Sequence, residues 1–225
     1  MDKEFSEKEL NELAKQLSCP SGKNGLTVAK QMNKSNISMT LATIEELDLK
    51  SGQFVLELGH GNGEHLDIIF HQALDLHYFG LEVSKLMKEA AEQNNNVFLI
   101  NGWATFSLYD GLKLPFDKDT FDVVFTVNTI YFWTNPIQLL NDIHRVLKKG
   151  GTCYLTFAQK KFMQGLSFTK NEFTMYDNND IITLISKTPF KLIDIINKSE
   201  KVKSKTGEVV KRDYAIVCLE ADKII

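Results

Sequence analysis

The chain has 225 residues, of which 43% are hydrophobic and 24% are charged, and its formal net charge is −3. This composition is typical of a globular protein and excludes a largely disordered chain. The sequence pI near 6.0 provides no basic surface for a nucleic-acid backbone. The longest apolar runs fall well short of the roughly 20 residues that cross a bilayer. We therefore expect neither a nucleic-acid nor a membrane partner.

The cysteines and histidines also exclude some classes of site. Cys19, Cys153 and Cys218 lie far apart without CxxC spacing, and residues 1–11 are charged rather than apolar. We expect free thiols in a reducing cytoplasm and no secretory signal. A zinc-binding helix places two histidines four residues apart, whereas His60, His65 and His71 are five and six apart. We therefore predict no metal site, and we expect these histidines to be solvated or part of a ligand-binding loop.

Residues 1–50 are predicted to form helices that cover one edge of the fold. Apolar residues recur at helical spacing from Phe5 to Leu17, and a break follows at residues 18–22. A second helical run covers residues 26–49. Four polar residues of low helix propensity weaken its middle, so two pieces are expected there: Asn33, Ser35, Asn36 and Ser38.

From residue 51 onward, strands alternate with helices, which predicts a doubly wound α/β sheet. The predicted strands are 54–58, 77–83, 103–108, 121–127, 153–157, 190–196 and 212–219. One helix is expected from Ser84 to about Asn101, although residues 97–100 could instead be the third strand. Another helix starts at Pro136 and is expected to close at residues 148–151. A last helix is predicted over 178–187, and residues 187–212 are expected to form a solvated hairpin.

A glycine-rich turn follows the first strand and is the most informative segment of the chain. Gly59, Gly61 and Gly63 lie between a buried parallel strand and a helix, where open α/β sheets bind ligands. Glu82 ends the next strand and can accept ribose hydroxyls. The sixth position of a GxGxxG pattern is Glu64 rather than glycine, and Glu57 also flanks the turn. Acidic neighbours disfavour a pyrophosphate and favour the cationic S-adenosylmethionine.

Five segments occur in the order found in one enzyme family. They are VLELGHGNG (55–63), GLEVS (80–84), YDGLKLPF (109–116), FDVVFTVNTIYFW (121–133) and RVLKKGG (145–151). Together they resemble the class I S-adenosylmethionine-dependent methyltransferases, most of all the small-molecule enzymes of the ubiquinone/menaquinone-biosynthesis type. The resemblance implies a Rossmann-like, mostly parallel seven-stranded sheet, here with residues 1–50 as an N-terminal helical cap and 51–225 as the methyltransferase domain.

The resemblance also implies which residues bind the cofactor. Glu82 is expected on the ribose and Asp110 on the adenine amino group. Two positions depart from the family: Tyr109 stands where glycine is common, and His60 where small residues are common. The full set of predicted cofactor-binding residues is Glu57, Gly59, His60, Gly61, Gly63, Glu82, Val83, Asp110, Gly111 and Asn128.

The acceptor side of the site is less defined by the sequence. Tyr131, Trp133 and Phe162 are predicted to line a substrate pocket, and His60, Tyr109 and Tyr131 are candidate general bases, with none assigned. Residues 128–131 contain no proline pair, which argues against methylation of a DNA base. The sequence predicts methyl transfer from S-adenosylmethionine to a small molecule, with S-adenosylhomocysteine as product. The alternative is a non-catalytic S-adenosylmethionine-binding module that serves as a sensor or partner subunit.

Overall fold

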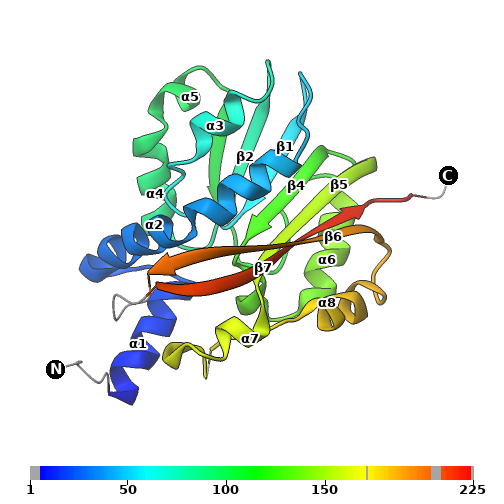
Figure 1. Cartoon of the computed structure of the whole chain (residues 1–225). Coiled ribbons are helices and arrows are strands. Elements are labelled where there is room, and N and C mark those ends of the chain that lie inside the picture. The colour runs from blue at the N-terminus through cyan, green and yellow to red at the C-terminus, as the bar shows by residue number, and fades with distance from the viewer. Residues whose placement is uncertain (1–5, 171, 204–208, 224–225) are drawn as a thin grey trace.

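One seven-stranded sheet organises the chain, and the computed structural model describes residues 6–170, 172–203 and 209–223 (Figure 1). The strand order is β3-β2-β1-β4-β5-β7-β6, and β7 runs antiparallel to both of its neighbours. The four pairings among β1 to β5 are parallel. The bounds are β1 (Phe54–Leu58), β2 (His77–Glu82), β3 (Ala104–Leu108), β4 (Phe121–Val127), β5 (Leu147–Ala158), β6 (Lys191–Lys203) and β7 (Val209–Glu220).

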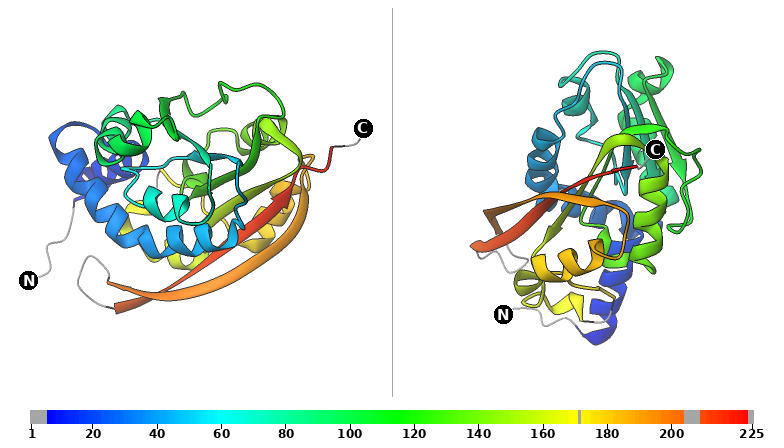
Figure 2. Two further views of the ribbon diagram at one scale, coloured as in Figure 1. Left: turned by 90° about the horizontal axis from the view of Figure 1, so that it is seen from above. Right: turned by 90° about the vertical axis from the view of Figure 1, so that its right-hand side faces the viewer.

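Helices cover both faces of this sheet, as the two views of Figure 2 show. α4 packs on β2 and β3, whereas α6 packs on β5 and α8 on β6. The predicted doubly wound, Rossmann-like fold is therefore confirmed. The helices are α3 (Leu66–Phe70), α4 (Lys85–Asn94), α5 (Asn96–Ile100), α6 (Pro136–Val146), α7 (Lys160–Met163) and α8 (Asn178–Ile185), with short 3₁₀ turns η1 (Ile130–Phe132) and η2 (Ser167–Thr169).

The N-terminal cap consists of α1 (Glu7–Ser18) and α2 (Gly22–Glu46). The prediction of two pieces in the second run was wrong, because α2 is one helix of 25 residues. Its polar middle is held from outside: the buried Arg212 guanidinium donates to the carbonyl of Ser35 and to Oδ1 of Asn36. These tertiary bonds offset a weak local helix propensity. Figures 1 and 2 show α2 running beside the long β6–β7 hairpin.

Two predicted boundaries of helices differ from the structure. The predicted helix over residues 84–101 is divided at Asn95, whose buried amide donates to the carbonyls of Ala91 and Gly63 instead of leaving the helix regular. The third strand predicted at 103–108 is confirmed at 104–108, and the alternative at 97–100 was wrong. Residues 148–151 do not close α6 but belong to β5, because Leu147 already pairs with Phe121 of β4.

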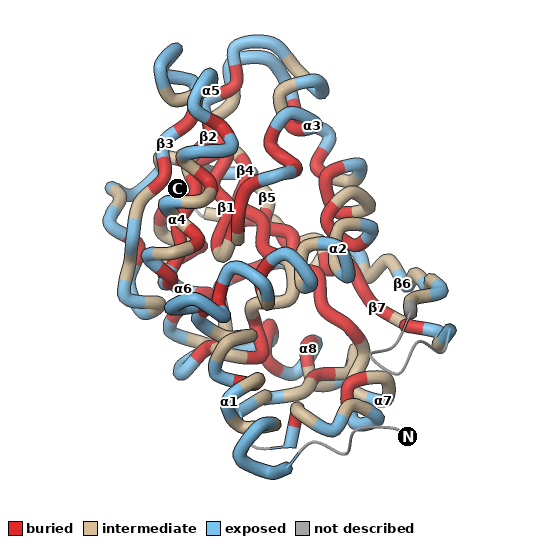
Figure 3. Tube along the Cα trace, turned by 90° about the vertical axis from the view of Figure 1, so that its left-hand side faces the viewer, coloured by how far each residue is buried: buried red, intermediate tan, exposed pale blue. Residues whose placement is uncertain are grey.

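The C-terminal hairpin is longer than predicted, and Arg212 within it is buried rather than solvated. The hydrophobic core runs through the central strands, where Figure 3 shows the highest concentration of buried residues. The same core includes Met39, Ile44 and Leu47 from the cap region, so its packing is continuous across residue 50. None of the described helices combines the length and apolar character needed to cross a membrane.

Candidate functional site

A cavity of about 340 Å³ lies at the carboxyl ends of β1, β2 and β4, against the cap. Its walls come from the glycine turn, the ends of those strands and the inner side of α2. The end of α1 and the turn after it, residues 17–20, also line the cavity. This is the edge at which an open α/β sheet binds its ligand. Of the thirteen predicted site residues, ten line it: Glu57, Gly59, His60, Gly61, Glu82, Val83, Asp110, Gly111, Asn128 and Trp133.

The glycine turn is shaped by backbone conformations that favour glycine. Gly59, Gly61 and Gly63 all have positive φ, at 74°, 57° and 65°. A Cβ on Gly59 would lie 2.4 Å from Cγ2 of Thr129, whereas a Cβ on Gly61 would meet nothing within 4 Å. Gly61 thus leaves open space in the cavity, and Gly59 permits close packing of β1 against the loop after β4. Gly63 supports the turn from behind, because its carbonyl accepts from Asn95, and it is not part of the cavity wall.

Glu57, near the end of β1, is buried and is paired through one of its carboxylate oxygens, as a buried charge requires. Its Oε2 lies 2.8 Å from Nε2 of His65 and accepts from the Tyr78 hydroxyl at 2.6 Å. Burial alone raises the pKa of Glu57, but the charge and hydrogen bond of His65 outweigh it and the pKa is lowered. Burial lowers the pKa of His65, and Glu57 more than reverses this. Of the two expectations for His65, solvation was wrong because it forms a buried ion pair, whereas its place at the ligand-binding turn agrees with its position on the cavity wall.

Glu82 ends β2 and faces the glycine turn. Its Oε1 accepts from the backbone N–H groups of Val83 and Ser84 at 2.8 and 3.0 Å, and its Oε2 accepts from the N–H of Gly61 at 3.1 Å. Burial raises its pKa despite these three donors. The carboxylate is therefore held rigidly at the cavity wall, with lone pairs still available to a ligand hydroxyl.

His60 is almost completely buried beneath the turn. Its Nδ1 lies 2.8 Å from the carbonyl of Gly61, its ring meets Phe106 edge-on, and its Nε2 has no partner among the described residues. Burial lowers the pKa of His60 to about 4. The imidazole is therefore neutral at pH 7, with Nδ1–H as the donor to Gly61. The ring packs against β2 and β3 and supports the turn.

The loop after β3 closes the far end of the cavity. Asp110 is exposed, and its Oδ1 accepts from the N–H groups of Leu112 and Lys113, which stabilises the turn there. These N–H donors, Lys113 first, lower the pKa of Asp110. Val83 and Gly111 lie against each other beside it, because a Cβ on Gly111 would be 3.4 Å from Cγ1 of Val83. Burial of Tyr109 raises the pKa of its phenol, which makes it a poor base.

The segment after β4 divides its side chains between cavity and core. Asn128, with φ of 59°, lines the cavity and so does Trp133, whose indole donates to Oγ1 of Thr129. Tyr131 does not line it: its buried hydroxyl accepts from the N–H of Ala158 and donates to Oδ1 of Asn128. Burial raises the pKa of Tyr131. Phe162 packs at the edge of the core, also outside the cavity wall.

The cap supplies cavity residues that the sequence predictions omitted. They lie on one side of α2 and are Ala29, Met32, Asn33, Asn36 and Thr40. The sequence contained a signal for these residues, because Asn33 and Asn36 are among the polar residues of low helix propensity in the middle of that helical run. Polar residues on the inner side of a covering helix indicate contact with a ligand or a polar anchor rather than a helix break.

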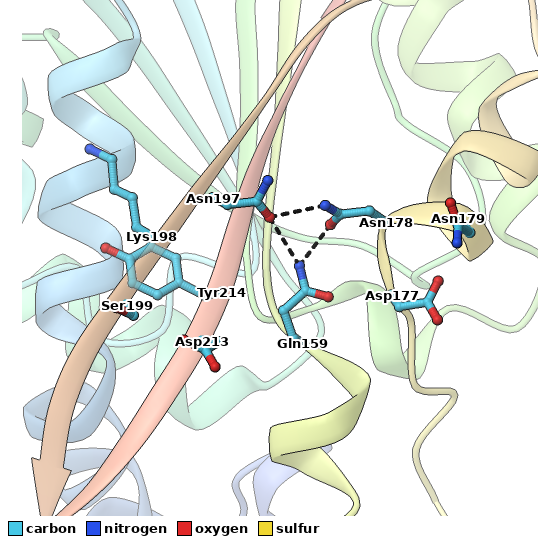
Figure 4. Close-up of a pocket in the computed structure, with 9 residues that line it drawn as sticks. All are labelled: Gln159, Asp177, Asn178, Asn179, Asn197, Lys198, Ser199, Asp213 and Tyr214. Carbon is cyan, nitrogen blue, oxygen red and sulfur yellow. Dashed lines mark hydrogen bonds between the residues drawn. The ribbon is translucent and has the colours of Figure 1, made fainter.

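A second hollow lies between α8 and the β6–β7 hairpin (Figure 4), with a volume of about 500 Å³. Three amides point toward one another there: Gln159 donates to Asn178 at 2.7 Å, and Asn178 donates to Asn197 at 2.9 Å. These bonds hold the three amides to one another across the hollow. Within the described ranges, no group of three or more His, Cys, Asp or Glu side chains could hold a metal ion.

The chemistry of the main cavity fits S-adenosylmethionine. Its charged lining side chains are the carboxylates of Glu57, Glu82 and Asp110 together with His65, and no Lys or Arg is among the described residues that line it. Carboxylates suit ribose hydroxyls and a cationic sulfonium or ammonium, whereas a pyrophosphate would require cations or N–H groups at a helix start. The open space at Gly61 leaves room for a ligand beside the backbone.

Comparisons with known proteins agree with this chemistry. Residues 56–155 match a family model described as a methyltransferase domain. The uncharacterized methyltransferase YdaC of Bacillus subtilis (strain 168) is 28% identical over 133 residues, which cover 58% of this chain and 70% of YdaC. Three further curated relatives are matched over 32% to 46% of their own length. The matched domain and these relatives support a methyltransferase.

Solved structures show the same fold. A methyltransferase from Haloferax volcanii, in complex with the Trm112 methyltransferase activator, has a TM-score of 0.72 at 17% identity, covering 88% of this chain and 94% of that one. Geranyl diphosphate C-methyltransferase from Streptomyces coelicolor A3(2), in complex with Mg²⁺, geranyl diphosphate and S-adenosyl-L-homocysteine, has a TM-score of 0.68 at 11% identity, covering 92% and 87%. At these identities the likeness concerns the fold.

Proposed function

We propose, on the premise of the methyltransferase domain at residues 56–155, that this chain transfers a methyl group from S-adenosylmethionine to a small-molecule acceptor in the cytoplasm. The observation that carries the proposal is the position of Glu82. Its carboxylate is buried at the end of β2, bonded to the N–H of Gly61, and lines a cavity that the cap covers. The resemblance to enzymes of the ubiquinone/menaquinone-biosynthesis type belongs to the proposal as well.

The residues that would hold S-adenosylmethionine follow from the cavity. Glu82 would accept the ribose hydroxyls, Asp110 would accept from the adenine amino group, and the turn from Gly59 to Gly61 would contact the amino-acid part through its backbone. Glu57 and its partner His65 hold that turn from below. When bound, S-adenosylmethionine supplies a methyl group on a sulfonium, which leaves readily.

The protein would contribute positioning and exclusion of water rather than proton transfer. The α2 helix covers the carboxyl ends of the strands, and Phe132 and Trp133 line the cavity near Asn128. A covered, partly aromatic cavity favours a desolvated sulfonium and an aligned acceptor. None of the three candidate bases has a pKa near 7: burial raises the pKa values of Tyr109 and Tyr131, and burial lowers the pKa of His60 to about 4. The acceptor would then have to present a group that is nucleophilic without deprotonation by a protein base.

Calorimetry and product analysis test the proposal in two stages. The full chain should bind S-adenosylhomocysteine, and incubation with labelled S-adenosylmethionine and fractionated small-molecule extract should give S-adenosylhomocysteine and a labelled metabolite. Absence of binding would refute the proposal. Binding with no transfer to any fraction would instead support the non-catalytic sensor or partner subunit.

A further inference from the structure

The acceptor end of the cavity is bounded by three amide side chains whose orientations are fixed by their neighbours. Asn36 and Asn33 come from α2, and Asn128 follows β4. Asn36 is bonded to Arg212 of β7 and Asn128 follows β4, whereas Glu82 ends β2 and Asp110 follows β3. The character of these amides decides which acceptors can be recognised. The following inference rests on the proposed function.

The orientation of the Asn36 amide is set by a buried cation. Oδ1 of Asn36 accepts from Nη1 of Arg212 at 3.1 Å, and a guanidinium has only donors. The oxygen must therefore face Arg212, and the NH₂ group is left for the cavity. No partner for this NH₂ group is found among the described residues.

The other two amides are also oriented by their neighbours. Oδ1 of Asn128 accepts from the Tyr131 hydroxyl at 2.9 Å, so its NH₂ group also faces away from Tyr131, with the weak acceptor Sδ of Met39 at 3.5 Å. The NH₂ group of Asn33 donates to the carboxylate of Glu64, which leaves its oxygen available. The cavity is therefore left with the NH₂ donor of Asn36 and the oxygen of Asn33, both uncharged, because the NH₂ group of Asn128 is directed at the buried Met39.

The nearest cation does not serve an anionic acceptor. Arg212 is buried, and Nε and Nη2 bind Glu200 at 2.9 and 2.7 Å, while Nη2 also donates to the carbonyl of Ser35 at 2.6 Å. Its charge is thus paired on the far side of Asn36. The acidic side chains on the cavity wall are Glu57, Glu82 and Asp110, so an anionic group would be repelled without compensation.

We propose that the acceptor is an uncharged molecule that presents an oxygen hydrogen-bond acceptor, such as a carbonyl, to the Asn36 amide, and that Arg212 is the positioning residue that keeps this amide's donor in the cavity. Anions are excluded by the carboxylates of the wall. An ammonium group is disfavoured at Asn36, because the facing NH₂ group is itself a donor. A charged ligand would lose its hydration on entering the cavity, and neutral amide groups do not compensate this free-energy cost.

Three matched probes test this proposal on the full chain saturated with S-adenosylhomocysteine. Benzamide, benzoate and benzylamine share one ring and differ in charge, and their binding is measured by ligand-observed NMR titration. Benzamide should bind at least tenfold more tightly than either of the other two. Equal or tighter binding of benzoate or benzylamine, or no binding of benzamide, would overturn the proposal. A chain that fails to bind S-adenosylhomocysteine refutes the proposed function instead.

An isosteric variant tests the role of Asn36 itself. Asn36→Asp keeps an oxygen for Arg212 but replaces the cavity-facing donor by an acceptor. Benzamide affinity should fall at least fivefold and benzylamine affinity should rise, with the affinity for S-adenosylhomocysteine unchanged. Asn24→Asp makes the same chemical change on the exposed side of α2 and should alter none of these affinities. Unchanged benzamide affinity in Asn36→Asp would refute the role of the Asn36 amide as the donor to the acceptor. If that variant does not fold, the affinities of the three probes for the wild-type chain test the proposal.

Discussion

Glu57 and His65 form an ion pair, with 2.8 Å between Oε2 and Nε2, whose side chains are only 3% and 5% exposed. The pair joins the end of β1 to the residue that precedes α3, on either side of the glycine turn. The Tyr78 hydroxyl donates a hydrogen bond to the same carboxylate oxygen, which connects β2 to the pair as well. The conformation of the turn is therefore fixed from beneath by buried electrostatics.

Removal of one partner of this pair should destabilise the protein strongly. His65→Ala leaves the Glu57 carboxylate buried with only the Tyr78 hydroxyl, and breaking a buried pair costs about 3–5 kcal/mol. The free energy of unfolding, measured by urea titration, should fall by about that amount. His71→Ala provides the control, because His71 is exposed and bonds only to the carbonyl of Asp67. A loss below 1 kcal/mol in His65→Ala would show that the pair is replaceable.

His60 should make the protein less stable as the pH falls from 6.5 to 4. Its pKa in the folded protein is about 4, below its ordinary value of 6.5, so the unfolded chain binds the extra proton first. The unfolding free energy should decline across this window by about 3 kcal/mol from His60 alone. The variant His60→Gln should show a shallower decline when the two pH profiles are compared. Identical profiles would mean that the pKa of His60 is not lowered in the folded protein.

Gly59 should tolerate alanine less well than another glycine of similar conformation. Gly59→Ala suffers the positive φ of 74° and a contact of 2.4 Å with Cγ2 of Thr129, whereas Gly52→Ala has a φ of 77° and open space. We expect a loss of about 1 kcal/mol for Gly52→Ala and about 1–3 kcal/mol more for Gly59→Ala in thermal or urea unfolding. Thr129→Ser removes Cγ2 and should recover part of the second loss. Without that recovery, the contact with Thr129 is not the cause.

Glu82→Gln should weaken the binding of S-adenosylhomocysteine at least tenfold, or about 1.4 kcal/mol. The change keeps the size of the side chain but removes the charge that strengthens bonds from ribose hydroxyls. Isothermal calorimetry measures the affinity, and thermal unfolding shows whether the turn still forms. Glu89→Gln, on the exposed side of α4, should leave the affinity unchanged. A folded Glu82→Gln protein with full affinity would remove Glu82 from the ribose site.

The sequence was sufficient to predict the sheet and the turn because those signals are local. Buried parallel strands appear as apolar runs, and the glycines with Glu82 mark the ligand edge in one contiguous segment. The third strand could be assigned because residues 104–108 alternate, while residues 97–100 continue a helical spacing. These features depend on neighbouring residues alone.

The errors concern residues whose environment is made by distant parts of the chain. The continuity of α2 depends on Arg212, and the burial of His65 depends on Glu57 and Tyr78 across the sheet. Tyr131 follows β4 as predicted, but the N–H of Ala158 binds its hydroxyl and holds it in the core. Sequence spacing cannot tell whether a polar or aromatic residue at the ligand-binding edge of the sheet points into the cavity or into the core. That depends on which distant residue bonds to its side chain.

The anchor between α2 and β7 has a consequence for how the protein is made. Arg212 and Asn36 are separated by 176 positions, so the ribosome releases α2 long before the strand that orients its amide. Contacts between such distant segments form late, since loop closure must precede them. A nascent chain can assemble β1, the glycine turn and β2 early. The Asn36 side of the cavity forms only when β7 joins the sheet. Synthesis of β7 thereby becomes the step that fixes the orientation of the Asn36 amide.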